Sequence, residues 1–379
     1  MRSRAAVLIL VCLGAAMAQQ PALDPRASLK IEFPPDSPVT LVSADLGDTA
    51  TMARGSAMVI DLRSSLSLRN SGPRRIRSVT LLVTAQEVTA GGKASVSIPS
   101  LNVALGETFP VRIDLRLLRP LMPLGPLVVV SLDGVLFEDL SFYGPNRLNS
   151  RRSMTVWEME ARRDRRHFKS VLASLGEDGL RKTIIESLAR QADVPRVDVQ
   201  VARGGRATNV EAEKPLQFAF MRLPDAPIEL LGGVAQIVGN EARAPSFDVR
   251  NRSARSVRYF ELGWIVKDSG GREFLAGSVP ASDPDLRLAP GQKSQVLQPG
   301  SLRFMGAPGR PLAITGMTGF VSQVEFVDGS IWIPTWEALN DPKLALARVM
   351  APSPEEQRLT ELYRRKGLAA VMMDLKRFE

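Results

Sequence analysis

The chain contains 379 residues, of which 49 are lysine or arginine and 40 are aspartate or glutamate, giving a formal net charge of +9. It has a single histidine and a single cysteine, which excludes a two-histidine zinc site and a disulfide within the chain. The basic residues include ten lysines and therefore 39 arginines, spread along the whole sequence. This spread indicates a bias of composition. We therefore expect no nucleic-acid partner, although a basic protein can adhere to anionic surfaces.

Residues 1–18 have the pattern of a secretory signal peptide. Two arginines precede an apolar run from Ala5 to Ala16, and Ala16-Met17-Ala18 has the small outer residues that a signal peptidase needs before Gln19. The run is too short to cross a hydrocarbon core of about 30 Å comfortably. We therefore expect an exported protein, periplasmic or extracellular. A retained anchor is the alternative.

Cys12 lies within this segment and would be removed with it. Lipidation of Cys12 is disfavoured because Val11 stands where a small residue is expected. The mature chain then has no thiol, which excludes cysteine nucleophiles and thiolate metal ligands. No later stretch is long and apolar enough for a transmembrane helix, so we expect none in the mature chain.

Six short motifs occur twice in the same order and indicate an internal duplication. The offsets between copies lie between 179 and 195 positions and change only where loops can absorb insertions. The pairs are Pro35-Asp36-Ser37-Pro38-Val39 with Pro224-Asp225-Ala226-Pro227-Ile228, Leu68-Arg69-Asn70 with Val249-Arg250-Asn251, Gly91-Gly92 with Gly270-Gly271, Ala104-Leu105-Gly106-Glu107 with Ala289-Pro290-Gly291-Gln292, Leu132-Asp133-Gly134-Val135-Leu136-Phe137 with Val327-Asp328-Gly329-Ser330-Ile331-Trp332, and Trp157-Glu158 with Trp336-Glu337.

Within each copy the hydrophobic period is that of β-strands, in which alternate side chains share one face. Thr80 and Leu82 are expected to point away from the core. The residues expected to face it are Leu66, Leu68, Val79, Leu81 and Val83 in the first copy and Phe247, Val249, Phe260, Leu262, Trp264 and Val266 in the second.

Polar turns separate these strands. Asn70-Ser71-Gly72-Pro73 and Asn251-Arg252-Ser253 can hydrogen-bond their own backbone in a tight reversal. Asp133-Gly134 and Asp328-Gly329 suit two-residue hairpin turns. Strands with turn signals about every ten residues predict a mainly β fold, with one antiparallel sandwich in each copy.

Each sandwich is expected to be followed by a short helical segment. In the first copy we predict one helix from Thr155, which would form a capping box with Glu158, and another from Asp178 to Gln191. In the second copy we predict one helix over 343–350 and another that opens at Ser353-Pro354 and that Gly367 can interrupt. The stripe that faces the first sandwich would contain Trp157, Ala161, Phe168, Val171, Leu172 and Leu175.

The predicted organisation is a signal peptide over 1–18, the first sandwich with its helices over 19–195, a connecting segment over 196–214 and the second sandwich with its helices over 215–379. A strand is expected at Val197–Val201, before an exposed loop at 202–206. The Arg-Asn-x-Ser turn, the Gly-Gly tip, the Pro-Gly turn and the Asp-Gly-x-x-Trp hairpin resemble those of immunoglobulin-like sandwich modules of secreted bacterial proteins. This resemblance implies a binding or structural part rather than a catalyst.

Catalytic constellations are sparse. His167 is the only histidine that could activate a serine, and a solvated helix position is the simpler interpretation. Gly-x-Ser-x-Gly elbows and phosphate-binding glycine loops do not occur, and no cofactor or metal is expected. Glu138, Asp139, Asp283 and Asp285 are carboxylates near turns. A glycosidase would need two carboxyls about 5 or 9 Å apart across a cleft, and turn formation is the better explanation for these four.

The most basic segment is the helix over 151–169. Arg162, Arg163, Arg165 and Arg166 are expected on the side away from the stripe of Trp157 and Phe168, either as a solvated face or as a contact for an acidic partner, a phospholipid layer or an anionic polysaccharide. The resulting hypothesis is an exported, non-enzymatic binding or structural protein of the cell envelope. The alternative is a secreted hydrolase that uses carboxylates in a cleft between the two copies.

Overall fold

The computed structural model describes residues 28–87, 90–120, 125–193, 197–202, 213–282, 286–298, 300–306, 309–341 and 352–378. The signal segment, the loop from 203 onward, Asp283 with Asp285 and the helix expected over 343–350 lie outside these ranges. The chain divides into two compact units. The first contains Met1–Ser71, Leu81–Val96 and Gly106–Leu132, and the second contains Gly72–Thr80, Ser97–Leu105 and Asp133–Glu379.

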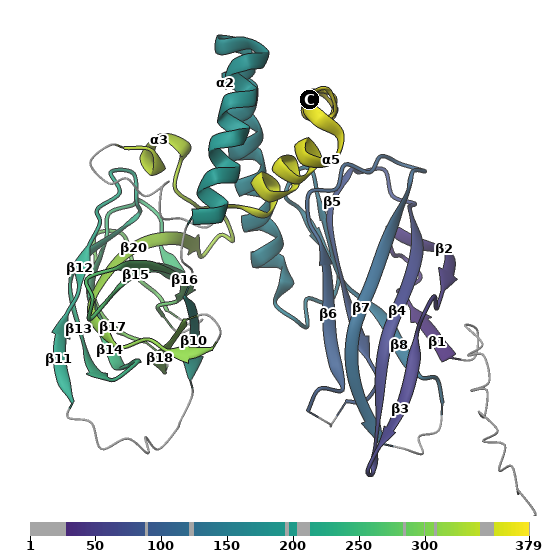
Figure 1. Ribbon diagram of the computed structural model, residues 1–379, viewed down its shortest axis with the longest axis horizontal. Helices are drawn as coiled ribbons and strands as arrows, with labels where there is room; N and C mark the ends of the chain where they lie inside the picture. The colour runs from purple at the N-terminus through teal and green to yellow at the C-terminus, as the bar shows by residue number, and fades with distance from the viewer. Residues whose placement is uncertain are drawn as a thin grey trace, which may run out of the picture. The chain divides into compact units, whose positions relative to one another are not determined.

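The first unit contains an antiparallel sheet that runs in the order β2-β4-β3, with β7 also paired to β4 (Figure 1). Leu62, Leu66 and Leu68 are fully buried along β4 and alternate with more exposed residues, as a strand with one face toward a core requires. The predicted inward positions of Leu66 and Leu68 are therefore confirmed. The strands are β2 (Val39–Asp45), β3 (Ala50–Arg54), β4 (Ala57–Asn70) and β7 (Thr108–Pro120).

A further sheet has the order β1-β8-β5-β6, with β9 paired to β8. Its strands are β1 (Leu29–Glu32), β5 (Ile76–Thr84), β6 (Lys93–Ile98), β8 (Val128–Phe137) and β9 (Phe142–Tyr143). The outward orientation expected for Thr80 and Leu82 does not leave them exposed, because β5 is buried on both faces. The hydroxyls of Thr80 and Ser97 lie 2.9 Å apart.

The hairpin turn expected at Asp133-Gly134 is wrong. Both residues lie inside β8, and the Asp133 carboxylate is buried. It accepts hydrogen bonds from the Ser150 hydroxyl at 2.6 Å and from the Leu148 backbone N–H at 3.2 Å. Asp133 therefore fixes the start of the helix that follows rather than a reversal of the chain. The reversal after β8 occurs at Asp139–Ser141, where Leu140 has a positive φ of 63°.

The sandwich over residues 198–332 belongs to the second unit, and Figure 1 shows its two sheets around a common core. One sheet has the order β10-β18-β14-β13-β11, with β17 on β14 and β19 on β18; the other has the order β12-β20-β15-β16, with β21 on β20. The strands are β10 (Asp198–Ala202), β11 (Lys214–Gln217), β12 (Ala219–Phe220), β13 (Ile228–Val238), β14 (Glu241–Asn251), β15 (Val257–Asp268), β16 (Glu273–Pro280), β17 (Lys293–Leu297), β18 (Ser301–Gly306), β19 (Arg310–Pro311), β20 (Ile314–Phe326) and β21 (Ile331–Trp332).

The core of this sandwich consists of side chains from both sheets, including Phe247 of β14, Trp264 of β15 and Phe304 of β18. The rings of Phe218 and Trp264 pack edge to face with centroids 5.0 Å apart. All six inward positions expected here are fully buried, and β10 confirms the strand expected at 197–201. The period of two in the sequence therefore identified this core correctly.

The helices also belong to the second unit. The helix α2 (Ser150–Asp193) has non-helical backbone at Gly176, with φ 69°, so the second helix expected from Asp178 is confirmed as its continuation beyond the kink. The capping box at Thr155 is wrong, because α2 begins at Ser150 and the Thr155 hydroxyl donates to the Arg151 carbonyl one turn back, at 2.8 Å.

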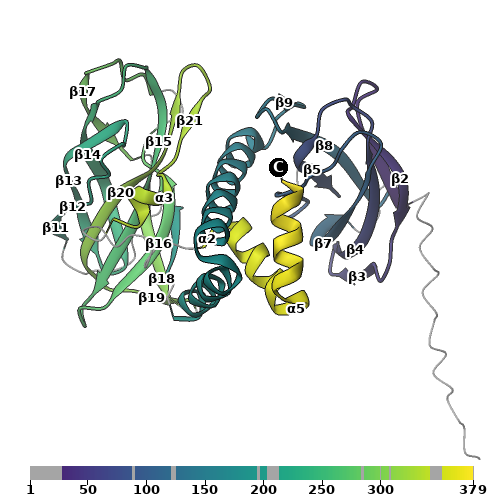
Figure 2. The same cartoon turned by 90° about the horizontal axis from the view of Figure 1, so that it is seen from above.

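In the described part of the chain, two further helices follow the sandwich over residues 198–332. They are α3 (Trp336–Leu339) and α5 (Pro354–Arg377). As expected, Ser353 caps α5 and Gly367 interrupts it, with φ 78°. Figure 2 shows α2 and α5 side by side, and a cluster of buried apolar residues joins them: Phe168, Leu180 and Ile184 with Leu359, Val371 and Leu375. Among the described residues, none of the helices has the length and apolar character needed to cross a bilayer.

Candidate binding site on helix α2

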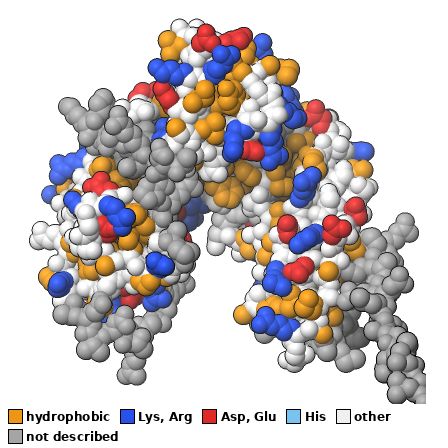
Figure 3. All heavy atoms as spheres, viewed as in Figure 1, with side chains coloured by type: hydrophobic (Ala, Val, Ile, Leu, Met, Phe, Trp, Pro, Cys, Tyr) orange, Lys and Arg blue, Asp and Glu red, His pale blue; other side chains and the backbone are white. Residues whose placement is uncertain are grey.

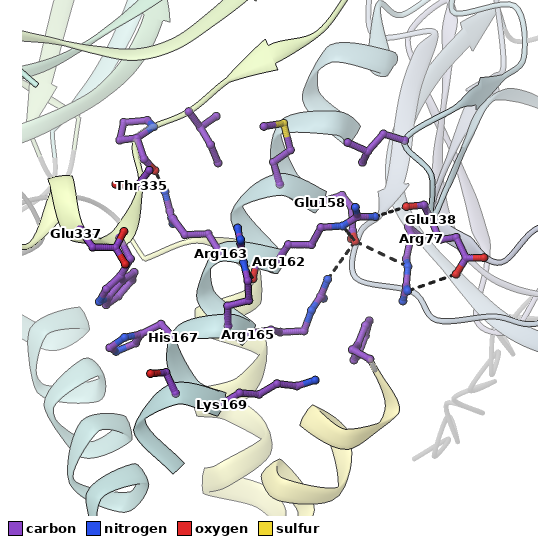
Figure 4. A pocket seen from close by; sticks show the side chains of 18 residues that line it. Arg77, Glu138, Glu158, Arg162, Arg163, Arg165, His167, Lys169, Thr335 and Glu337 are labelled. Carbon is purple, nitrogen blue, oxygen red and sulfur yellow. Dashed lines mark hydrogen bonds and ion pairs between the residues drawn. The ribbon is translucent and has the colours of Figure 1, made fainter. Parts of the chain in front are cut away.

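An open hollow of ≈ 980 Å³ runs along α2 within the second unit. Figure 4 shows it from close by, with side chains from α2, from the turn after β8 and from the segment that leads into α3. Basic groups outnumber acidic groups in its lining. The charged lining residues are Arg77, Arg162, Arg163, Arg165, Arg166 and Lys169 with Glu138, Glu158 and Glu337.

Glu158 is the centre of the charge network in this hollow. Its buried carboxylate accepts hydrogen bonds from Arg162 Nε at 2.8 Å and from Arg165 Nη2 at 3.1 Å, and Arg77 Nε lies 3.8 Å away. Figure 4 shows Arg77 and Arg165 directed toward this carboxylate from different elements. The four- and seven-residue spacings on α2 place both arginines on the same face as Glu158. A buried carboxylate is tolerated only with such partners.

A second buried ion pair on α2 joins Arg163 to Asp164. Arg163 Nε donates to Asp164 Oδ1 at 3.0 Å, and Arg163 Nη1 donates to the Pro334 carbonyl at 3.3 Å. The Ser353 hydroxyl donates to Asp164 and accepts from the Glu356 backbone N–H at 3.0 Å. Burial raises the pKa of Asp164, and the Arg163 charge partly opposes this rise. Asp164 therefore links α2 to the N-terminus of α5.

Glu355 makes a third connection between the helices. Arg165 Nη1 donates to Glu355 at 3.1 Å, and Arg358 Nη2 donates to the same oxygen at 2.8 Å. Burial acts to raise the pKa of Glu355, but the hydrogen bonds and charge of Arg358, together with the charge of Arg165, outweigh burial and hold the pKa below its ordinary value. The Arg165 guanidinium also lies over the Phe378 ring, 4.0 Å from its centroid.

The four arginines expected on a solvated face are thus not equivalent. Arg163 and Arg165 are buried, with 8% and 4% of their surface exposed, Arg162 is half-buried, and only Arg166 is exposed. The expectation of a common solvated face is wrong for the two buried residues. Arg163 pairs with its neighbour Asp164, whereas the Glu355 partner of Arg165 is 190 positions away on α5, so no local pattern shows that contact. The four-residue spacing of Glu158 and Arg162 is a local signal for their ion pair, whereas the sequence pattern predicts a capping box of Glu158 with Thr155.

His167 also differs from the expected solvated position. It is half-buried, and its ring stacks on Trp336 with centroids 4.0 Å apart and planes 22° apart. Burial lowers the pKa of His167, Glu356 opposes this, and the Arg190 charge adds to it. Among the described residues no serine hydroxyl hydrogen-bonds His167, so the structure assembles no serine triad around it.

The carboxylates considered from the sequence have separate environments. Asp139 accepts from the Ser141 backbone N–H at 3.0 Å and from the Ser141 hydroxyl, and these hydrogen bonds lower its pKa. Glu138 lies 3.8 Å from both Arg75 and Arg77. Asp139 thus has the contacts of a turn-forming acid. Within the described ranges no group of three or more histidine, cysteine or acidic side chains is arranged to hold a metal ion.

Two cations in the hollow are not used by the internal network. Among the described residues, neither Arg166 nor Lys169 forms an ion pair; Arg166 Nε donates only to the Arg162 carbonyl, at 3.3 Å. On the face seen in Figure 3, acidic and basic side chains are interspersed and no patch of a single sign dominates. The hollow is therefore a local concentration of positive charge, with Trp336 and Phe378 as its aromatic surfaces.

The fold and site define a mainly β protein whose helices enclose a basic hollow. No protein-family model matches the sequence, and no curated protein matches it. Among solved structures, similarity is found to the crystal structure of a transglutaminase from red sea bream (11% identity over 75% of this chain and 31% of that chain, TM-score 0.12), to pT26-6p (8% identity over 89% and 72%, TM-score 0.15) and to the 11S allergen from Cocos nucifera (11% identity over 84% and 98%, TM-score 0.07). At these TM-scores the likenesses carry no argument about fold or function.

Proposed function

We propose that this chain is an exported, non-enzymatic binding protein of the cell envelope and that the α2 hollow binds an acidic segment of a partner protein. The observation that carries this proposal is the presence of Arg166 and Lys169 in the hollow without an ion-pair partner in the described chain. Arg162 and Arg165 neutralise the buried acids Glu158 and Glu355. Their role is to hold the elements that form the hollow, while the two free cations meet the ligand.

The concave shape favours a protein segment over a membrane surface. A flat layer of head groups reaches side chains that protrude, whereas Arg163 and Arg165 lie within the protein. An extended chain can enter a hollow of ≈ 980 Å³ and place carboxylates against Arg166 and Lys169. The stacked rings of His167 and Trp336 offer an apolar surface for the neighbouring side chains of such a segment.

The proposal also includes a duplicated, immunoglobulin-like scaffold, and matched topology supports the duplication. The orders β1-β8-β5-β6 with β9 and β12-β20-β15-β16 with β21 are the same, and both begin with a parallel pair. The Asn70 backbone N–H donates to the Glu107 carbonyl at 3.0 Å, and that of Asn251 donates to the Gln292 carbonyl at 3.0 Å. Duplication explains why two turns so far apart in sequence have the same backbone partners.

The same comparison changes one of the sequence pairs. Arg74 lies over the Phe137 ring at 3.9 Å and 3.8 Å from Asp139; Arg255 lies over the Phe326 ring at 3.6 Å and 3.8 Å from Asp328. The counterpart of Asp328 is therefore Asp139, and the alignment of Asp328 with Asp133 is wrong. What the two copies share is an arginine that lies over a phenylalanine ring and near an aspartate of the turn, rather than the Asp-Gly dipeptide.

The test is retention of the protein by an immobilised acidic peptide, measured at low and high salt. Arg166→Gln with Lys169→Gln should weaken retention at low salt by at least tenfold, because two of the charges that attract the ligand are lost. The matched control is Lys182→Gln, an exposed residue of α2 outside the hollow. Equal retention of all three proteins would contradict the proposal. Retention by anionic vesicles but not by the peptide would instead support a membrane-surface function.

A further inference from the structure

A second, smaller pocket lies on the other side of α2, also within the second unit. It has a volume of ≈ 410 Å³, a size at which small molecules are bound in proteins. Its walls come from α2, from the sheet that contains β15, β16 and β20, and from the segment that enters α5. It shares Arg163 and Pro334 with the basic hollow, but its acidic and aromatic lining is its own: Glu160, Glu261, Trp157 and Phe320.

Two glycines open the floor of this pocket. A Cβ atom at Gly263 would lie 2.2 Å from the Phe320 ring, so only glycine allows that ring to cross the strand. The pairing of β15 with β16 is irregular between Gly263 and Ile265, and Gly277 lies opposite this irregularity with φ 79°. A bulge with glycines leaves space where a regular sheet would present side chains.

Glu261 is held in place at the floor by hydroxyl donors. The Tyr259 hydroxyl donates to one carboxylate oxygen at 2.6 Å, and the Ser278 hydroxyl donates to the other at 2.8 Å. Burial, followed by the neighbouring Glu261 charge, raises the pKa of Tyr259, so this phenol stays a donor. The carboxylate of Glu261 is therefore oriented as a fixed acceptor.

Glu160 lacks such partners. Within the described residues no hydrogen bond or ion pair reaches its carboxyl group, which lines the pocket. Burial raises the pKa of Glu160 to about 7; the Arg163 charge opposes the rise, and the charges of Asp164 and Glu261 add to it. The Arg163 guanidinium donates to Asp164 and to the Pro334 carbonyl, and within the described residues it makes no hydrogen bond to Glu160.

We propose that this pocket binds a small ligand with a protonated amine, whose ammonium group lies between Glu160 and Glu261. An ammonium supplies the positive charge and the donors that the Glu160 carboxyl lacks. The rings of Trp157 and Phe320 provide aromatic faces for the cation and for an apolar stem. A neutral polyol of the same shape offers hydroxyl donors but brings no positive charge to the two acids.

The experiment is calorimetric titration of the full chain at pH 7 with putrescine and, as its uncharged counterpart of equal length, 1,4-butanediol. We expect putrescine to bind at least tenfold more tightly than the diol. Repeating the titration in buffers of different ionisation enthalpy should show proton release on binding, because the ammonium favours the ionised form of Glu160. Equal affinity for the two probes would overturn the proposal, as would the absence of binding of putrescine at millimolar concentration.

Variants locate the binding. Glu160→Gln should weaken putrescine binding at least tenfold and abolish the proton release, and the protein should still fold because the change removes a carboxyl that burial disfavours. Glu361→Gln, an acid on α5 outside both pockets, is the matched control and should bind putrescine as the unaltered chain does. Unchanged affinity of Glu160→Gln would overturn the proposal. Retention by the acidic peptide is measured in parallel, so failure at either site is distinguished from failure at the other.

Discussion

The buried and half-buried acids of the second unit differ in how their charge is compensated. Glu158 and Glu355 each accept from two guanidinium groups, and Asp164 accepts from Arg163 and a serine hydroxyl. Glu160, on the same helix, has only the nearby charge of Arg163. Burial raises the pKa of Asp164 and of Glu160, whereas at Glu355 the hydrogen bonds and charge of Arg358, with the charge of Arg165, outweigh burial and hold the pKa below its ordinary value.

Replacing Glu160 by glutamine should change the pH dependence of stability. The folded-state pKa of about 7 lies above the ordinary value of 4.5. The stabilising contribution of Glu160 is thus fully present below pH 4.5 and is lost as pH rises through about 7. The glutamine in Glu160→Gln does not ionise, so this variant does not lose stability as pH rises. At pH 8 we expect its unfolding free energy to be higher than that of the unaltered chain, by at most about 3 kcal/mol.

Urea unfolding at pH 5 and pH 8 measures this difference. The gap between the two proteins should be larger at pH 8 than at pH 5. Glu361→Gln is a suitable control, because Glu361 is a more exposed acid paired with Arg365 on α5. A constant gap between the Glu160→Gln variant and the unaltered chain across this range would contradict the assigned pKa.

The Ser353 hydroxyl both caps α5 and hydrogen-bonds a buried acid of α2. It caps α5 by accepting from the Glu356 backbone N–H at 3.0 Å, and it donates to the buried Asp164. Ser353→Ala should therefore reduce the unfolding free energy by about 1–3 kcal/mol, since it removes a cap and leaves a buried acceptor without its donor. Thermal unfolding monitored by circular dichroism measures the effect. Ser170→Ala, at an exposed position of α2, should leave the transition within about 0.5 kcal/mol.

At the scale of elements, the stripe expected on α2 divides into positions with different environments. Phe168 is 1% exposed and packs against α5, whereas Leu175 is 67% exposed just before the kink at Gly176. Phe168→Ala should lower the unfolding free energy by about 3–5 kcal/mol because it leaves a cavity. Leu175→Ala should change it by less than about 0.5 kcal/mol. Similar losses for both variants in urea unfolding would contradict the arrangement of the helices.

Strands were more predictable from the sequence than the site. Alternation identified the inward residues of β14 because one face of that strand meets the core. It also identified those of β15, although Leu262–Val266 is buried on both faces. It failed for Thr80 because β5 is covered on both faces, and a period of two cannot indicate that. Asp133-Gly134 has the composition of a turn, but both residues lie within β8. The Asp133 carboxylate there accepts a hydrogen bond from the Ser150 hydroxyl.

The site depended on contacts that no local pattern encodes. Arg165 meets Glu355 and His167 meets Trp336 only after the second sandwich has returned the chain to α2. The charge run over 162–169 lies along the basic hollow, yet its spacing does not separate arginines that pair with buried acids from Arg166 and Lys169, which form no ion pair among the described residues. The sequence does not predict the second pocket, because Glu160 and Glu261 are 101 positions apart (261 − 160) and no local pattern brings them together.

At the scale of the whole molecule, the second unit is assembled from three separate stretches of chain. Besides residues from Asp133 onward it contains 72–80 and 97–105. Arg77, from the first of these, donates at 2.6 Å to Asn102, from the second, and Asn102 donates at 2.5 Å to the Arg377 carbonyl. The C-terminal end of α5 is thus fixed by residues that precede α2 by more than forty positions.

A fragment that starts at Asp133 should therefore be less stable than the same residues in the full chain. It lacks Arg77, so Glu158 loses a neighbouring cation, and Arg377 loses its hydrogen bond from Asn102. Arg77 is 8% exposed, and this burial lowers its pKa while the Glu158 charge opposes the shift. Hydrogen exchange of the α2 and α5 amides measures the consequence: we expect faster exchange in the fragment. Equal protection in fragment and full chain would mean that these helices and the second sandwich need no residue before Asp133, and that the unit folds from its continuous stretch alone.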